Sequence, residues 1–265
     1  MKILQKATTF IHPGQRESQE DHFLINDMAL AVANGKGRLL AVMDGHCGDT
    51  IGLCLHDHIV TSFSQSLFLC DGDISATLRR IFKELDVVCV HETCGSSLSV
   101  VYIPVDDSDD DTAAVYCAYM GDSPIVVFDR DGKLQSSHLH NVEHAEFDIL
   151  SIAEKHAAKI ESGELSIEER YLSIGSRYLQ LTRSIGDRHF GDVLIREPEL
   201  HTFTANRKSI VMLATDGILV QNNIQQLYQH LIGMAGRGDT AREMGEWVLN
   251  QHAFDNTTIV LQTFQ

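Results

Sequence analysis

The chain has 265 residues, of which 43% are hydrophobic and 22% charged, and its formal net charge at pH 7 is -16. This composition is typical of a folded globular protein with a sizeable core, and it excludes a disordered or fibrous chain. The negative charge argues against binding to nucleic acid or to an anionic membrane, because both would repel it.

The sequence gives two indications of the cellular compartment, namely its targeting signals and its cysteines. No apolar run is long enough to cross a bilayer, and the polar N-terminus lacks the apolar core of a signal peptide. The six cysteines show no C-x-x-C spacing and lie mostly in apolar runs, which predicts free thiols and no zinc site built from them. We therefore expect a monomeric protein of the reducing cytoplasm.

Apolar runs rich in β-branched residues predict six strands, in chain order at 38–43, 97–105, 113–120, 124–128, 209–214 and 257–264. Most follow one another without an intervening helix, which predicts antiparallel hairpins. The acidic stretch 106–111 is predicted to be an exposed hairpin tip, because it lacks the glycine and glutamate of a calcium loop. Asp131-Gly132 is typical of a tight hairpin turn.

Helical periodicity recurs between these strands, at 49–69, 74–92, 143–161, 222–235 and 240–252. Helices clustered between groups of strands predict an α+β fold, in which two sheets pack together and the helices lie outside. The polar segment 138–175 is predicted to be a helix plus a flap.

Acidic residues stand where the apolar strands begin or end. They are Glu20, Asp21, Asp44, Asp122, Asp216 and Asp255. Strand ends are rigid, so carboxylates placed there can converge on one point, and Mg²⁺ or Mn²⁺ requires such oxygen ligands. The carbonyl of Gly45 can add another ligand, because glycine permits close approach. A single Asp-Gly pair is more often a turn, but the repetition favours a metal site.

These residues belong to motifs by which the chain resembles the metal-dependent serine/threonine phosphatases of the type 2C, or PPM, family. The motifs run in the family's order from residue 16 to about residue 260, as RESQED, DGHCG, GSSLSVV, MGDSP, LTRSIGD, ATDGIL and DNTTIV. The resemblance implies one domain over residues 1–265. Its fold would be a four-layer α-β-β-α sandwich, with two central antiparallel sheets flanked by helices.

The resemblance also implies a cofactor and a ligand set. Two Mn²⁺ or Mg²⁺ ions would be bridged by Asp44. Gly45 and Glu20 would complete one side of the pair, and Asp216 and Asp255 would hold the other ion. Asp21 would orient a water, and the nucleophile would be a hydroxide held between the ions.

Two further residues have roles by the same resemblance. Arg16 would grip the substrate phosphate, since its planar fork matches phosphate oxygens. Taken alone, it is more simply a surface partner of Glu17 or Glu20. His46 would be the general acid that protonates the serine or threonine leaving group of a phosphoprotein substrate.

The chain departs from the family pattern at Val220, where an aspartate often pairs with the acid at Asp122 to hold a third ion. We therefore expect a third ion to bind weakly. Asp187 is predicted to order a turn, Cys47 to pack, and the segment 56–58 (His-Asp-His) to lie on an exposed helix face rather than bind metal. Two rival interpretations remain, a pseudophosphatase that binds phosphoproteins without turnover and a purely structural domain.

Overall fold

The computed structural model describes residues 4–29, 36–105, 112–129, 133–207, 209–219, 224–237 and 240–264. The expectations for 106–111, for 131–132 and for Val220 concern residues outside these ranges.

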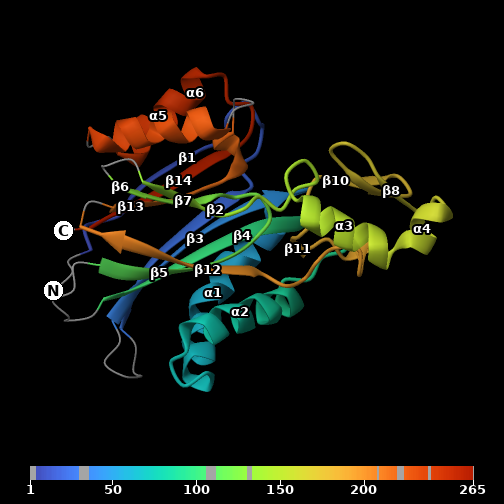
Figure 1. Cartoon of the computed structure of the whole chain (residues 1–265), viewed down its shortest axis with the longest axis horizontal. Coiled ribbons are helices and arrows are strands. Elements are labelled where there is room, and N and C mark those ends of the chain that lie inside the picture. The colour runs from blue at the N-terminus through green and yellow to red at the C-terminus, as the bar shows by residue number, and fades with distance from the viewer. Residues whose placement is uncertain are drawn as a thin grey trace.

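Two antiparallel sheets pack face to face, and a pair of helices covers the outer face of each (Figure 1). The first sheet has the order β12-β5-β4-β3-β2, and β11 pairs with β4. Its strands are β2 (Asp21–Ala29), β3 (Lys36–His46), β4 (Gly95–Val105), β5 (Thr112–Met120), β11 (Ile185–Gly186) and β12 (Glu199–Asn206).

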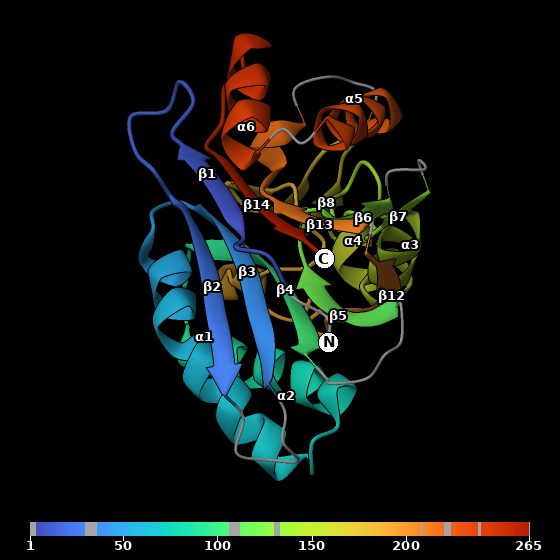
Figure 2. The same ribbon diagram turned by 90° about the vertical axis from the view of Figure 1, so that its left-hand side faces the viewer.

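The second sheet has the order β1-β14-β13-β6-β7. Its strands are β1 (Thr8–His12), β6 (Ile125–Asp129), β7 (Leu134–Ser136), β13 (Ser209–Ala214) and β14 (Thr257–Thr263). The outer helices are α1 (Thr50–Leu69) and α2 (Ile74–Val88) on the first sheet, and α5 (Ile224–Gly236) and α6 (Ala241–Asn250) on the second. Figure 2 shows β2 and β3 lying over α1 and α2, and β14 and β13 lying beneath α5 and α6.

Both faces of the central strands are buried, which explains why these strands are continuous apolar runs. In β3, Leu39, Ala41 and Met43 pack toward α1 and α2. The alternate residues Leu40 and Val42 pack between the two sheets. Successive side chains of a strand point to opposite faces, so one uninterrupted run fills two cores. The strands β13 and β14 divide their side chains in the same way.

Local capping chemistry starts two of the outer helices. The Asp73 carboxylate accepts a hydrogen bond from the Ala76 N–H at 2.9 Å and caps α2. At α6, Thr240 and Glu243 form a reciprocal capping box. Such caps satisfy N–H groups that have no partner within the helix.

The predicted flap is a small subdomain that projects from one end of the sandwich (Figure 1). It contains α3 (Glu146–Lys155), α4 (Ala157–Glu161) and a three-stranded sheet of β8 (Leu165–Ile167), β9 (Leu172–Ile174) and β10 (Arg177–Leu179). The single helix expected over 143–161 is wrong. His156 leaves helical geometry where its ring contacts the Asp192 carbonyl at 3.0 Å.

The expectation of six free thiols is also wrong for two of them. Cys54 of α1 and Cys89, just after α2, form a disulfide across the helix pair. Their spacing of 35 residues gives no sign of this, because the pairing depends on how the two helices pack. Among the described residues, no helix is both long and apolar enough to span a membrane.

The α+β fold class is confirmed, and the six predicted strands and four of the five predicted helices are present within a few residues of their expected bounds. The N-terminal strand expected to begin at Glu20 and Asp21 is β2, whereas strands β1, β7 and β12 and the small strands β8 to β11 were not predicted. They are short, or they lack a continuous apolar run.

Candidate active site

The strand-end acids of the two sheets converge at one end of the sandwich. Asp21 and Asp44 are direct cross-strand partners on β2 and β3. Asp216 follows β13 and Asp255 stands two residues before β14. The backbone N–H of Asp216 lies 3.4 Å from Asp44 Oδ2, so acids 172 positions apart in the chain meet where the two sheets abut.

Asp21 joins the two sheets at this point. Its side chain is 2% exposed, and its Oδ2 accepts hydrogen bonds from the Thr215 and Thr258 hydroxyls, both at 2.8 Å. Its Oδ1 is buried and has no hydrogen-bond partner. Burial raises the pKa of Asp21 to about 6, although the two threonine hydrogen bonds work against the shift. A buried carboxylate oxygen without a donor is suited to a cation or to an ordered water.

The neighbouring acids repel one another. Burial, and then repulsion from Asp216, raises the pKa of Asp44 well above its usual range. Burial, and then repulsion from Asp122, does the same for Asp216. Carboxylates held this close are stable in the ionised form only when positive charge compensates them. The all-oxygen donor set therefore fits hard divalent cations.

Glu20 lies in the loop that precedes β2 and is held by backbone N–H groups at and just after the end of β3. Its Oε2 accepts the Gly48 N–H at 3.0 Å, and its backbone carbonyl accepts the Gly45 N–H at 3.3 Å. Asn256 secures this loop from the other sheet. Its Oδ1 accepts the Glu20 N–H at 2.6 Å, and its Nδ2 donates to the Pro13 and Ser18 carbonyls at 3.0 and 2.9 Å.

Arg16 lies at the rim of the acids. Its Nη2 donates to Asp255 Oδ2 at 2.6 Å, and its guanidinium carbon is 5.1 Å from the centre of the Phe254 ring. Taken alone, the sequence suggests that Arg16 pairs with Glu17 or Glu20. In the structure Arg16 pairs with Asp255 instead, which is 239 positions further along the chain. The Asp255 contact uses one of the five N–H donors of the guanidinium.

His46 ends β3 next to Asp44 and lines the same cavity of about 490 Å³ as Arg16. Its Nε2 lies 2.9 Å from both carboxylate oxygens of Asp187. Asp187 Oδ2 also accepts the Ser184 hydroxyl at 2.6 Å. A carboxylate on one ring nitrogen stabilises the imidazolium and leaves Nδ1 as the nitrogen that can deliver a proton.

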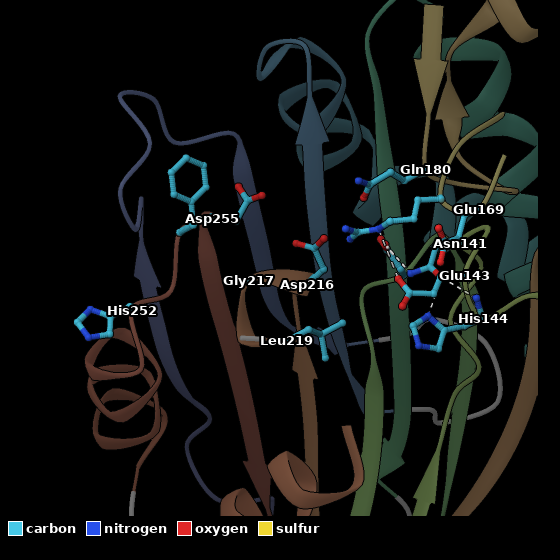
Figure 3. A pocket seen from close by; sticks show the side chains of 13 residues that line it. Asn141, Glu143, His144, Glu169, Gln180, Asp216, Gly217, Leu219, His252 and Asp255 are labelled. Atoms are coloured by element: carbon cyan, nitrogen blue, oxygen red, sulfur yellow. Dashed lines mark hydrogen bonds and ion pairs between the residues drawn. The ribbon is translucent and has the colours of Figure 1, made fainter. Parts of the chain in front are cut away.

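Asp122 lies on the flap side of the acids. Burial raises its pKa, and the Asn141 amide donates to its Oδ2 at 3.2 Å. A second cavity, of about 800 Å³, adjoins it between the sheets and the flap. Figure 3 shows Asp216 and Asp255 on the sheet side of this cavity and Asn141, Glu143, Glu169 and Gln180 on the flap side.

Eight of the nine predicted site residues thus line two cavities that share Asp122, Asp216 and Asp255, and the ninth, Asp21, is the cross-strand partner of Asp44. Sequence reasoning missed the partners that orient them, namely Asn141, Thr215, Asn256 and Thr258, and it took Asp187 for a turn residue only. Asp187 does order a turn, with a left-handed backbone (φ 48°), and it contacts His46 as well. All of these residues except Asn141 lie in the quoted motifs: Asp187 in LTRSIGD, Thr215 in ATDGIL, and Asn256 and Thr258 in DNTTIV. The motifs themselves were therefore the available signal.

The expectation for Cys47 is wrong, whereas the 56–58 segment lies where it was expected. Cys47 is exposed and has a φ of 60°, so the expectation that it packs is wrong. The 56–58 segment lies on α1 as expected, where Asp57 and His58 are exposed and His56 is half-buried.

The chain is similar to known proteins in family and in fold. The family model described as Protein phosphatase 2C matches residues 11–232. No curated protein matches the chain in sequence. The fold is similar to a serine-threonine phosphatase 2C from Toxoplasma gondii, with a TM-score of 0.73 and 16% identity over 100% of this chain and 99% of that one.

Two other solved structures are similar. A C. elegans sex determining protein matches with a TM-score of 0.69 and 22% identity, over 97% of this chain and 64% of that one. The chain therefore spans just under two thirds of that protein. The catalytic domain of serine threonine protein phosphatase PstP, in complex with 2 manganese ions, matches with a TM-score of 0.57 and 17% identity, over 100% and 99% of the two chains. These likenesses establish a shared fold.

Proposed function

The chain belongs to the protein phosphatase 2C family of protein serine/threonine phosphatases, and we propose that it hydrolyses phosphoserine and phosphothreonine in proteins with two divalent metal ions. The observation that carries this proposal is the set of converging carboxylates. Burial and repulsion from neighbouring carboxylates raise the pKa values of Asp44 and Asp216, and the buried Oδ1 of Asp21 lacks a donor. A cation would relieve both conditions.

We propose the ligand assignment that the resemblance implies. Asp44, the Gly45 carbonyl and Glu20 would hold one Mn²⁺ or Mg²⁺ ion, and Asp44, Asp216 and Asp255 the other. Asp21 would orient water. When bound, such a pair of ions lowers the pKa of water and neutralises charge on phosphoryl oxygens. A weak third ion at Asp122 stays a prediction, since Val220 lies outside the described residues.

The protein's own side chains account for substrate handling. Arg16 stands at the cavity rim with guanidinium N–H groups to spare, and it would hold the phosphoryl oxygens. His46 would deliver a proton from Nδ1 to the departing serine or threonine oxygen, while Asp187 stabilises the imidazolium through Nε2.

The proposal extends to the domain, its partner and its cellular location. We infer that residues 1–265 act as one catalytic domain, because the acids come from positions 20 to 255 and both sheets contribute to the site. A phosphoprotein is the partner, and a monomer remains our expectation. A cytoplasmic location stays a prediction, and the Cys54–Cys89 disulfide is of a kind that persists mainly in oxidising compartments.

Phosphate release from a phosphothreonine peptide, with Mn²⁺ and with chelator, tests the proposal. Activity should require the metal, and Asp44→Asn should lower it on the order of 100-fold or more. Asp57→Asn, an exposed acid on α1, is the matched control and should leave activity unchanged. A wild type that binds the phosphopeptide and Mn²⁺ without releasing phosphate would identify the pseudophosphatase instead.

A further inference from the structure

Three imidazoles surround one carboxylate on the side of the first sheet next to the flap, outside the acidic site. His138 Nδ1 lies 2.8 Å and His201 Nε2 lies 2.7 Å from Glu199 Oε1. His140 Nε2 lies 2.8 Å from the other oxygen, Glu199 Oε2. The ligand atoms of His138, Glu199 and His201 all lie within 4.8 Å of one another.

The spacing of these residues explains how four side chains meet. The chain carries His138-Leu139-His140 before α3 and Glu199-Leu200-His201 at the start of β12. Glu199 and His201 are two apart on β12, so their side chains point to the same face of the sheet. The first segment is fixed by the His140 N–H, which donates to the Gly121 carbonyl at 2.9 Å. Each segment therefore presents a pair of polar side chains to the other.

Buried neighbours orient the carboxylate. His140 is 2% exposed and stacks on Tyr119 with ring centres 5.0 Å apart. Tyr119 is the direct cross-strand partner of Glu199 on β5, and its hydroxyl also hydrogen-bonds the carboxylate. In protein metal sites, a ligating carboxylate is itself held by such second partners.

The electrostatics and exposure of the cluster suit a cation. Burial works to raise the pKa of Glu199, but hydrogen bonds from His140, His201 and Tyr119 outweigh it and hold the pKa well below its usual range. The carboxylate is thus ionised at neutral pH. The side chain of His140 is 2% exposed, that of Glu199 24%, that of His201 33% and that of His138 72%, which leaves an open path from solvent.

We propose that His138, Glu199 and His201 form a binding site for a borderline transition-metal ion, Zn²⁺ above all. Two imidazoles and one carboxylate are a donor set that Zn²⁺ takes, with solvent at the open fourth position. Tetrahedral bonds of about 2.0–2.2 Å place neighbouring ligand atoms roughly 3.3 Å apart, so the present contacts open by about half an ångström when the ion replaces shared protons. His140 and Tyr119 hold the carboxylate.

This site differs from the acidic one in chemistry and in consequence. The acids offer only oxygen, which suits Mg²⁺ and Mn²⁺, whereas imidazole nitrogen favours Zn²⁺, Ni²⁺ and Co²⁺. An ion here would tie the 138–140 segment to β12. Asn141, the next residue, donates to Asp122, so occupancy would be transmitted to the flap side of the cavity. The inference does not rest on the proposed phosphatase activity.

The test uses the full chain without a histidine tag, with the Cys54–Cys89 disulfide intact and with Mg²⁺ in excess to fill the acidic site. Co²⁺ is added first, because its visible absorption is strong in four- or five-coordinate sites and weak in octahedral oxygen sites. Zn²⁺ is then used to displace it, and calorimetry gives its stoichiometry. We expect one strongly absorbing Co²⁺ per chain, displaced by one Zn²⁺.

The variant His138→Ala/His201→Ala should lose the absorption and weaken Zn²⁺ binding on the order of 100-fold or more. The matched variant His56→Ala/His58→Ala removes two histidines from α1, including the one beside Cys54, and should behave as wild type. Zn²⁺ should also raise the thermal midpoint of wild type and not of the 138/201 variant. The proposal is overturned if both variants bind Co²⁺ and Zn²⁺ as wild type does, or if the signal follows His56 and His58.

Discussion

His46 Nε2 lies 2.9 Å from both carboxylate oxygens of Asp187, a residue 141 positions further along the chain. Asp187 is 3% exposed, and its turn is braced by Arg196, which donates to its backbone carbonyl at 3.2 Å. The histidine beside the proposed metal ligands is therefore held by a buried carboxylate that belongs to a different motif. Because Asp187 occupies Nε2, Nδ1 is the ring nitrogen that would face the substrate in the proposed reaction.

Asp187→Asn should remove the charge that stabilises the His46 imidazolium. Hydrolysis of a phosphothreonine peptide should slow roughly 10–100-fold, because the alkoxide leaving group needs a proton. p-Nitrophenyl phosphate hydrolysis should change little, since p-nitrophenolate leaves without one. Steady-state kinetics on both substrates make the comparison, and Asp192→Asn, an exposed acid in the same region, is the control. Equal losses on both substrates would mean that Asp187 only shapes its turn.

Gly95→Ala tests the same pair by steric displacement. A methyl group at this position would meet Asp187 Oδ2 at 2.0 Å and His46 Nε2 at 2.7 Å. The two side chains must move apart, so we expect the substrate-selective loss of Asp187→Asn together with a lower thermal midpoint. Gly233→Ala on α5 is the control, because its nearest neighbour is a flexible arginine end at 3.9 Å. Unchanged phosphopeptide kinetics in Gly95→Ala would contradict the structure here.

Asn256→Ala should free the loop that carries Arg16 and Glu20. The amide of Asn256 makes three hydrogen bonds to that loop, which alanine cannot replace. We expect the Mn²⁺ concentration for half-maximal activity and the KM for phosphopeptide both to rise, each about tenfold, a loss of roughly 1.4 kcal/mol apiece. Metal titration and substrate titration measure the two separately. Asn250→Ala, exposed at the end of α6, should alter neither.

Removing divalent metal should make stability depend on pH through the raised pKa of Asp21. Because its folded pKa is about 6 and its ordinary value is 3.8, the folded state binds the extra proton between these values. The contribution of Asp21 to the free energy of unfolding of the metal-free protein should therefore fall by a few kcal/mol as pH rises from about 4 through about 6. Asp44 and Asp216 contribute in the same direction.

Urea unfolding at several pH values, with chelator and with saturating Mg²⁺, measures this effect. Mg²⁺ should restore stability above pH 6 and flatten the profile, since a cation compensates the ionised carboxylates. The double variant Asp44→Asn/Asp216→Asn should have a flatter profile without metal. A double variant whose pH profile without metal matches that of the metal-free wild type would show that the acids are not held as described.

Much of this architecture is readable from the sequence because its physical cause is local. The apolar run of β3 serves two cores, and β13 behaves likewise, so their continuity predicts buried strands. Capping residues such as Asp73 and Thr240 mark helix starts within one turn. The acids at strand ends, together with the motif order, predicted which residues meet and which cations they suit.

Relationships between distant segments depended on how the sheets and helices pack. The sequence shows Arg16, Asp187 and Asn256, but not that they contact Asp255, His46 and Glu20. It shows six cysteines and fourteen histidines, but not the Cys54–Cys89 bond or the cluster at Glu199. Each such contact joins segments far apart in the chain, and the packing of the sheets, helices and connecting segments determines their separation in space. The spacing of residues in the sequence does not determine the distance between two such segments in space, so only the tertiary structure shows these contacts.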